Sequence, residues 1–393
     1  MLRKPRCGDS WVRLEQLQGY EGPTGWAGGA VQTFLQSGSR PTGINFTLGH
    51  HGIRMATTHP TRRHLALRKR IGSGAAVMDV IEWLLDGDPA IRWQVMRDLT
   101  DAPADTVTAE RARVEHHGWG ARLLALEGDD GLWAGGACFP ADYAGGEPGQ
   151  PWTATMHTLQ SLQLFGLPPA SVAGRRAVGL IAEHGRWEHA GQPYFDGEVE
   201  PCINGRTIEA GAHFGVDVTA IVDRVLGEQL ADGGWNCEAE NGSVRSSFHT
   251  TIDVLDGLVE FERSTGGSPA VSEARHRAEE YLLERGLMRR KSTREIVDPA
   301  FLEFAFPYYW RYDVLRALDY FRSAAAHPDP RMAEAVDIVV SKRQPDGCWL
   351  LDRIHPGRVH FDLESAPGTP SRWNTLRAMR VLRWWNAPAT VRP

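Results

Sequence analysis

The sequence predicts an all-α protein built from about six helix pairs. Three observations carry this prediction. Apolar residues recur at helical spacing along most of the chain after residue 78. Glycine-containing turns separate these segments, and the turn-and-helix unit repeats with a period of roughly 43–65 residues. No pattern of alternating apolar and polar residues competes convincingly, so we expect few strands.

The clearest copy of the unit covers residues 229–262. Asp232, Gly233 and Gly234 form a tight turn, because glycine adopts positive φ without steric cost. Ser246 or Ser247 then caps the next helix by accepting from its free N–H groups. That helix has one apolar face, formed by Phe248, Ile252, Leu255 and Val259.

The other elements follow from the same signals in chain order. A short apolar segment at 80–85 precedes Asp88-Pro89, where a cap and a proline at the first helical position restart a helix. Further helices are expected at about 105–127, 152–165, 170–185, 204–214, 217–230 and 246–262. The last ones cover 268–287, the stretch holding Phe306 to Leu318, 329–343 and 371–385.

Each pair combines a relatively polar helix with an apolar, aromatic one. Such an array buries its apolar helices against those of its neighbours. Six pairs can close into a ring around an inner barrel of apolar helices, or remain an open superhelix. The chain has 14 tryptophans, and an open array would leave many aromatic side chains facing water. The aromatic content therefore favours the ring.

The composition limits which kinds of binding partner and which cell compartments are expected. The net charge of −6 argues against a nucleic-acid partner. The sequence contains neither an apolar run long enough to span a membrane nor a signal-peptide pattern. Five cysteines, widely spaced and odd in number, do not resemble a disulfide framework. We therefore expect a cytoplasmic protein. Peripheral contact between the mouth of the ring and a membrane surface is compatible with these observations. The sequence does not determine the oligomeric state.

Residues 1–75 differ from the remainder. They hold eleven basic residues against three acidic ones and show no sustained periodicity. We expect a disordered basic extension, ahead of a helical domain at 78–387. The extension could touch an acidic surface, or it could have no function and precede a true start at Met78.

Three glutamine–tryptophan phrases are in phase with the helix pairs. They are similar to the repeats of squalene–hopene cyclases, and so resemble the α/α-toroid superfamily, which also includes protein prenyltransferase beta subunits. The resemblance covers about residues 78–387. It implies an inner and an outer helical barrel, a tryptophan that packs and a glutamine that reaches a neighbouring helix end. The phrases are Gln229-x3-Gly233-x-Trp235, Gln344-x2-Gly347-x-Trp349 and Glu127-x3-Gly131-x-Trp133, the last with Glu in place of Gln.

The candidate catalytic and metal-binding motifs resemble those of only one branch of this superfamily, the protein prenyltransferase beta subunits. The sequence contains neither the D-x-D-D of the cyclases nor a D-D-x-x-D for magnesium diphosphate. Protein prenyltransferase beta subunits hold zinc with an Asp-x-Cys and a later histidine in an aromatic-His-Thr phrase. Similar phrases here are Glu200-Pro201-Cys202, with Glu substituted, and Gly233-Gly234 followed by Phe248-His249-Thr250 and Leu255-Asp256-Gly257-Leu258.

The resemblance therefore implies a zinc site formed by Cys202, His249 and Glu200, with Cys237 as an additional sulfur. Thiolate, imidazole and carboxylate ligands with an open fourth position suit a catalytic zinc ion. The alternative for Cys202 and His249 is a buried cysteine and a hydrogen-bonded core histidine. Cys237 could equally fill space as a small apolar side chain.

Other residues are candidates for catalysis or substrate binding. Asp313 is a candidate general acid if burial raises its pKa, and otherwise a carboxylate that stabilises a helix N-terminus. Glu238 and His249 complete the catalytic set, although Glu238 could be a solvated loop residue. Arg245 could hold an anion or pair with Glu238. The candidates for lining a substrate cavity, with core packing as the alternative, are Trp152, His157, Tyr308, Tyr309, Trp310, Tyr312 and Trp373.

Two hypotheses for function follow. The first is a terpenoid-cyclase-like or prenyltransferase-like enzyme, with zinc as its candidate cofactor, that binds a hydrophobic isoprenoid-type molecule in a central cavity. The second is a non-catalytic lipid-binding or scaffold toroid. The missing D-x-D-D favours the second, whereas the cluster of thiol and imidazole groups favours the first.

Overall fold

A computed structural model of the protein describes residues 79–146, 148–325 and 327–387, and the expectations for residues 1–75 lie outside this part. The described residues are mostly helical, which confirms the all-α prediction. They include a pair of two-residue antiparallel strands, in which Trp349 faces Ser371. None of the described helices has the length and apolar character needed to cross a bilayer.

The helices agree with most of the expected segments. The α-helices are α2 (Val80–Leu85), α3 (Pro89–Leu99), α4 (Ala104–Ala112), α5 (Gly118–Leu124), α6 (Thr155–Phe165), α7 (Val172–His184), α8 (Pro201–Phe214), α9 (Thr219–Gly227), α10 (Phe248–Thr265), α11 (Pro269–Leu283), α12 (Val314–Ala324), α13 (Ala333–Ser341) and α14 (Arg372–Trp385). Short 3-10 turns are η1 (Arg113–Glu115), η2 (Tyr194–Asp196), η3 (Cys237–Asn241), η4 (Pro299–Leu302) and η5 (Pro330–Met332), and the strands are β1 (Trp349–Leu350) and β2 (Pro370–Ser371).

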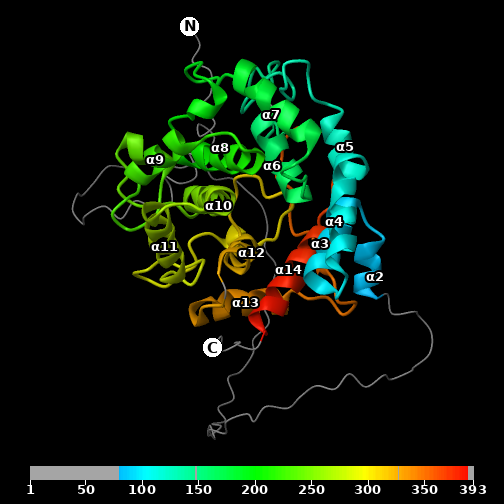
Figure 1. Ribbon diagram of the computed structural model, residues 1–393. Helices are drawn as coiled ribbons and strands as arrows, with labels where there is room; N and C mark the ends of the chain where they lie inside the picture. Colours follow the sequence, from blue (N-terminus) through cyan, green and yellow to red (C-terminus); the bar gives the residue numbers. More distant parts are fainter. Residues whose placement is uncertain (1–78, 147, 326, 388–393) are drawn as a thin grey trace, which may run out of the picture. The chain divides into compact units, whose positions relative to one another are not determined.

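Six helices contact one another in cyclic order. Helix α3 contacts α6, α6 contacts α8, α8 contacts α10, α10 contacts α12, α12 contacts α14, and α14 contacts α3 again. Figure 1 shows α8, α10 and α12 as successive neighbours and α14 beside α3. Other helices pack on this set: α4 on α3, α7 and α9 on α8, α11 on α10, and α13 on α12.

Hydrogen bonds and ion pairs show that α8 and α10, and likewise α10 and α12, run in the same direction. Arg206, early in α8, pairs with Asp253, early in α10, whereas His213 near the end of α8 pairs with Glu260 near the end of α10. The side chain of Gln163 in α6 donates to a carbonyl late in α8. The N-termini of these neighbouring helices therefore lie at one end of the bundle, where most of the candidate site residues are found.

Helices α8 and α10 approach closely because two glycines face each other's backbones. A Cβ on Gly205 would lie 2.4 Å from the carbonyl oxygen of Asp253, and one on Gly257 would lie 2.3 Å from that of Gly205. Only glycine is compatible with this separation. The contact fixes the relative position of the two helices that carry Cys202 and His249.

The three tryptophans of the repeated phrases make the same two hydrogen bonds. In each case the indole Nε1 donates to a carbonyl ten residues earlier, at the end of the preceding helix, over 2.7 Å. The tryptophan backbone N–H donates to a threonine hydroxyl in the first turn of a following helix, which is α6, α10 or α14. These threonines are Thr155, Thr251 and Thr375. Each buried indole thus joins one helix end to the next helix start.

The glutamine of the phrase reaches a neighbouring helix in one copy, and its glutamate substitute does so in another. Gln229 donates to the carbonyl of Ala274 in α11 over 2.8 Å. Glu127 accepts from Arg176 in α7 over 2.8 Å. Gln344 differs, since its amide donates to the nearby carbonyl of Lys342. The structural role implied by the resemblance therefore holds for two of the three copies.

Two expected helices were wrong in extent. The polar helix at 105–127 is interrupted, because Gly118 has a positive φ of 69° and α5 begins there. The stretch beginning at Phe306 is not helical until Val314. Its Phe306–Pro307 peptide bond is cis and Tyr309 has a φ of 48°, neither of which a helix accepts. Trp310 and Tyr312 therefore lie in a loop before α12.

Replacing Thr251 with valine tests the repeated junction. Valine keeps the shape of the side chain but leaves the buried N–H of Trp235 without its acceptor. We expect the free energy of unfolding to fall by about 1–3 kcal/mol in urea denaturation. Thr106→Val, at an exposed position of α4, is the control and should change stability little. Equal effects of the two substitutions would contradict the role of the threonine.

Candidate functional site

Three of the predicted metal ligands lie together. The ligand atoms of Glu200, Cys202 and Cys237 are all within 4.8 Å of one another. The two sulfurs are 2.7 Å apart, and the Sγ of Cys202 is 3.6 Å from a carboxylate oxygen of Glu200. Glu200 and Cys202 belong to the start of α8, and Cys237 begins the η3 turn after Trp235. The hydroxyl of Thr250 lies 3.3 Å from the Sγ of Cys237.

Burial controls the protonation of this cluster. Desolvation, with the neighbouring Cys237 and Glu200, raises the pKa of Cys202 well above its usual value. Desolvation also raises the pKa of Cys237. A helix N-terminus favours a thiolate, but the loss of hydration outweighs it here. A cation between the three groups would reverse this balance, because it stabilises their charged forms.

These residues fit a zinc ion in type and number. Zinc is bound by thiolates and carboxylates, and a catalytic site keeps one position open. The sulfur separation of 2.7 Å is longer than a disulfide bond. Two zinc-bound sulfurs at tetrahedral angles would be about 3.8 Å apart. A zinc ion would therefore require the two side chains to separate slightly, which needs only small rotations.

His249, the fourth predicted ligand, lies elsewhere. Its Nδ1 accepts a hydrogen bond of 2.8 Å from the backbone N–H of Tyr312, and its ring contacts those of Phe301 and Trp310. Thr250, the next residue in the helix, faces Cys237 instead. Successive helical residues point about 100° apart. The structure thus does not bring His249 to the cysteines.

Asp313 precedes α12 and combines the two roles considered from sequence. Its carboxylate caps the helix by accepting from the N–H of Arg316 over 2.7 Å. Burial raises its pKa, although Arg377 and Arg316 act in the opposite direction. Asp313 and Tyr312 line a small pocket together with His249. The hydroxyl of Tyr312 points away from it and donates to the carbonyl of Leu287.

An aromatic cluster lies at the start of α6 and in the loop before α12. Trp152 stacks on Tyr309 with ring centroids 4.1 Å apart, and His157 meets both rings edge-on. Gln150 links this cluster, because its amide lies 3.1 Å from His157 Nε2 and its oxygen accepts from the indole of Trp310. Burial lowers the pKa of His157 to about 3, so the imidazole is neutral at pH 7.

The remaining candidates lie apart from these groups. Tyr308 is stacked between the guanidinium groups of Arg316 and Arg377, and Trp373 stacks on Phe306 in a hydrophobic core. These positions correspond to the packing alternative.

Glu238 and Arg245 lie near the chain segment that carries Cys237. Glu238 accepts from the side chain of Asn241 and lies outside the cysteine cluster. The side chain of Arg245 is exposed, and its carbonyl accepts from Asn236. Both agree better with solvated loop positions than with catalytic or binding roles.

Buried ion pairs join α8, α10 and α12. Arg206 and Arg316 both donate to the same carboxylate oxygen of Asp253, over 2.7 and 2.6 Å, and both also donate to Asp256. Burial acts against the charge of each arginine, but the two aspartates raise the pKa of both guanidinium groups. The space between these three helices is thus occupied by charged side chains.

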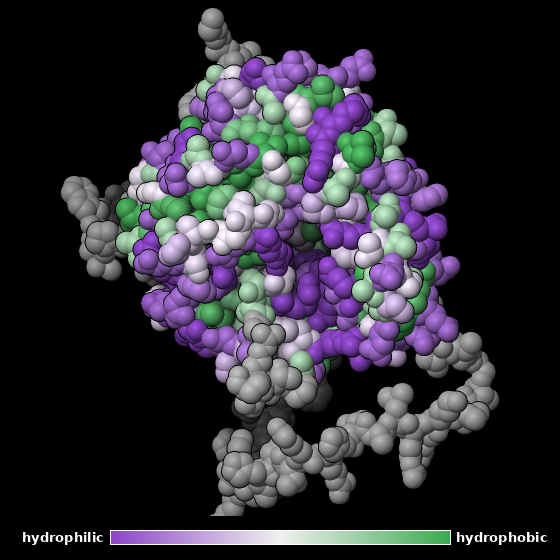
Figure 2. Space-filling model, in the orientation of Figure 1, coloured by the Kyte–Doolittle hydropathy of each residue, from purple (hydrophilic) through white to green (hydrophobic). Residues whose placement is uncertain are grey.

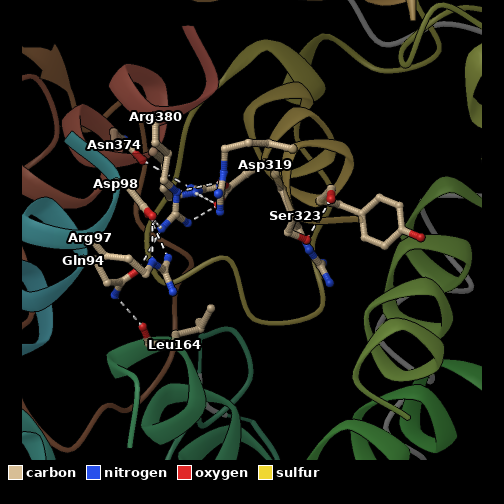
Figure 3. A network of polar contacts seen from close by, with 12 residues as sticks. Gln94, Arg97, Asp98, Leu164, Asp319, Ser323, Asn374 and Arg380 are labelled. Atoms are coloured by element: carbon tan, nitrogen blue, oxygen red, sulfur yellow. Dashed lines mark hydrogen bonds and ion pairs between the residues drawn. The ribbon is translucent and has the colours of Figure 1, made fainter. Parts of the chain in front are cut away.

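A second network joins α3, α12 and α14 (Figure 3). Arg380 donates to Asp319 over 2.7 Å and to Gln94 over 2.7 Å, and it lies 3.6 Å from Asp98. Gln94 in turn donates to the carbonyl of Leu164 at the end of α6. Hydrophilic residues also surround a hollow visible in Figure 2, on the face seen in Figure 1. Polar side chains therefore lie between several of the six helices that contact one another in cyclic order.

Sequence reasoning missed several residues that the structure brings to these sites. Gln150 lies in a loop without periodicity, and His355 and Arg353 lie in an irregular segment after β1. No local pattern marks such positions. The sequence does contain a signal for Arg206, Asp253 and Arg316, which are charged residues on otherwise apolar helices. Burial of such residues is costly unless they are paired, so their presence indicates ion pairs between helices.

Comparison with known proteins adds no identification. No protein-family model matches the chain, and a search of curated proteins finds no significant match. The chemistry of the site therefore depends on the geometry described above.

Asp319 provides a test of pH dependence. Burial opposes its charge, but Arg380 and Arg322 outweigh that effect and hold its pKa below the usual range. A lowered pKa contributes stability above about pH 4, and that stability is lost as the pH falls further. We expect Asp319→Asn to lower the free energy of unfolding by about 3 kcal/mol at pH 7, because Arg380 loses its main partner.

The same substitution should reduce the loss of stability between pH 5 and pH 3, since asparagine does not titrate. Urea denaturation at several pH values measures both effects. Asp223→Asn, at an exposed position in α9, is the matched control. A pH dependence identical to that of the wild type would show that Asp319 is not a source of acid sensitivity.

Proposed function

We propose that the protein is an α/α toroid that binds zinc through Glu200, Cys202 and Cys237 and acts on a hydrophobic, isoprenoid-type molecule. The observation that carries the proposal is the convergence of two sulfurs and a carboxylate within 4.8 Å. Their neighbours in sequence resemble the zinc phrases of protein prenyltransferase beta subunits. A ligand set without His249 would distinguish this site from the one that the resemblance implies.

The protein's own residues suit such a site. The N-terminus of α8 provides a favourable dipole for the charged forms of Glu200 and Cys202. Thr250 can hydrogen-bond to Cys237 and so orient its sulfur. A bound zinc ion would supply Lewis-acid chemistry at its open coordination position. Burial around Cys202 would exclude bulk water from the reacting group.

The toroid arrangement has support from three features of the helices. Six of them contact one another in cyclic order, α8, α10 and α12 run in the same direction, and other helices pack on the six. The tryptophan junctions repeat the same bonds in three places. Paired helices that close on themselves account for all three features together.

The aromatic cluster supports a hydrophobic ligand. Trp152, Tyr309 and Trp310 form a small hydrophobic cluster separate from the two main cores. Aromatic faces bind apolar chains and stabilise developing positive charge. Tyr309 and Trp310 belong to the loop that leads into α12, and the ring of Trp310 contacts that of His249 in the first turn of α10.

One observation favours the non-catalytic alternative. A toroid that accepts an isoprenoid needs an apolar interior, but charged side chains lie between α8, α10 and α12. A scaffold needs no such cavity. The enzyme and the scaffold therefore differ in whether metal and apolar ligand bind, whereas a non-catalytic lipid-binding toroid would bind the apolar ligand without the metal.

Metal analysis of the purified full-length protein is the first test. We expect about one zinc ion per chain, lost in Cys202→Ala and in Cys237→Ala because each removes a sulfur ligand. His249→Ala should retain the metal, since this imidazole is directed to Tyr312. Cys348→Ala, which removes a buried free cysteine elsewhere, should retain it too.

Mass spectrometry of the metal content gives the readout. Protein prepared with zinc present that nevertheless contains none would remove the zinc proposal. Loss of the metal in His249→Ala, with folding intact, would restore the ligand set implied by the resemblance.

Binding of a fluorescent farnesol analogue is the second test. We expect saturable binding that Trp310→Leu weakens by about tenfold, because a large aromatic contact is lost. Trp384→Leu, which alters a partly buried tryptophan of another cluster, should leave the affinity unchanged. If the wild-type protein shows no saturable binding, the scaffold alternative is favoured.

A further inference from the structure

A small pocket next to the start of α10 has features that the zinc proposal does not use. It has a volume of about 30 Å³ and is lined by side chains from η4, α10, the loop before α12 and the loop after β1. A single water needs roughly 10–15 Å³ of such space. The pocket therefore holds two or three atoms of water size and not a large group.

The pocket contains a buried histidine without partners. His355 is 4% exposed, and neither of its ring nitrogens has a hydrogen-bond partner among the described residues. A buried polar group left in this state costs about 1–3 kcal/mol. The imidazole lines the pocket, so a ligand or water there would satisfy it.

Two arginines add positive charge beside this imidazole. The guanidinium of Arg311 stacks on Trp310 at 4.2 Å, and its Nε has no hydrogen-bond partner in the part of the chain that the structure describes. Burial and the nearby Arg353 lower the pKa of Arg311 to about 10. Burial, Arg311 and Arg353 lower the pKa of His355 to about 2. Burial is the main cause of both shifts, and the neighbouring guanidinium groups act in the same direction.

Three carboxylates also line the pocket, and each has a partner. Asp298 caps the η4 turn by accepting from the N–H of Ala300, and Asp313 caps α12. Glu303 forms an ion pair with Arg353 over 3.2 Å. His249 accepts at Nδ1 from Tyr312, so its neutral ring carries the proton at Nε2 and is a donor there. Donors without an acidic partner thus predominate at His355 and Arg311.

We propose that this pocket binds the carboxylate group of a small organic acid, held by Arg311, His355 and His249. A carboxylate has two oxygen atoms, which match the volume of the pocket, whereas the four oxygens of a phosphate do not. A guanidinium and neutral imidazole N–H groups are favourable donors to it. The site is independent of the zinc cluster, and neither depends on the other being occupied.

Sodium formate is the probe for this site. Melting curves of the full-length protein are recorded in formate, phosphate and chloride at equal ionic strength. We expect a saturable rise in Tm with formate that exceeds the rise with phosphate or chloride. Phosphate is too large for the pocket, and chloride has no pair of oxygens for a guanidinium and an imidazole to donate to. Arg311→Met should weaken the formate response at least tenfold. Arg372→Met removes an arginine that stacks on Trp83 away from the pocket, and should leave the response unchanged.

Hexanoate distinguishes a free small acid from the head of a longer molecule. Tighter binding of hexanoate than of formate would assign the pocket to the head of an apolar acid, and weaker binding would assign it to a free small acid. An equal response to phosphate, or an unchanged formate response in Arg311→Met, would overturn the proposal.

A measurement on the wild-type protein covers the case in which Arg311→Met does not fold. With ¹⁵N-labelled histidine, NMR follows the imidazole of His355 at pH 7, where formate is ionised and the ring is neutral. We expect formate to shift the ring N–H resonance saturably, because the imidazole then donates to the carboxylate. A His355 spectrum that formate leaves unchanged would refute the proposal.

Discussion

The arrangement of the helices depends on the buried tryptophan at the end of each glycine turn. Its indole is bonded to the last turn of one helix and its backbone N–H to the first turn of the next. Both partners lie in the protein interior, where a missing hydrogen bond is costly. The junction therefore fixes where each inner helix begins. Because three junctions repeat the same geometry, three inner helices start in equivalent positions.

The positions at which the helices begin determine where the candidate site residues lie. Neighbouring helix N-termini gather at one end of the bundle, and with them the loops that precede them. Cys202, His249 and Asp313 all lie within the first turn of a helix or just before it. Residues separated by more than a hundred positions become neighbours without any strand pairing. The helix dipoles at this end also favour anionic groups, which agrees with both the thiol cluster and the anion pocket.

The sequence predicted the helices and the junctions well, because periodicity and turn chemistry are local signals. It predicted Cys202, Cys237 and Glu200 as neighbours through a resemblance. It assigned His249 to the same site, where the rotation between His249 and Thr250 decides the outcome. Spacing between motifs does not define which side of a helix faces which neighbour.

The loop before α12 was missed for a different reason. Phe306 to Asp313 have an apolar, aromatic composition that continues the pattern of the following helix. The backbone conformations of Pro307 and Tyr309 that prevent a helix depend on tertiary contacts. His355 and Arg353 come from another irregular segment, so no local pattern in the sequence predicts that they lie near Arg311.

The buried ion pairs bear on the choice between an enzyme and a scaffold. Apolar side chains of similar volume often stabilise a protein core as well as a buried ion pair does. One carboxylate oxygen of Asp253 and the Nε of Arg316 also lack hydrogen-bond partners among the described residues. The charged side chains between α8, α10 and α12 leave no apolar lining there for an isoprenoid chain, which favours a scaffold. An enzyme with this interior would bind an apolar ligand elsewhere, at the cluster of Trp152, Tyr309 and Trp310.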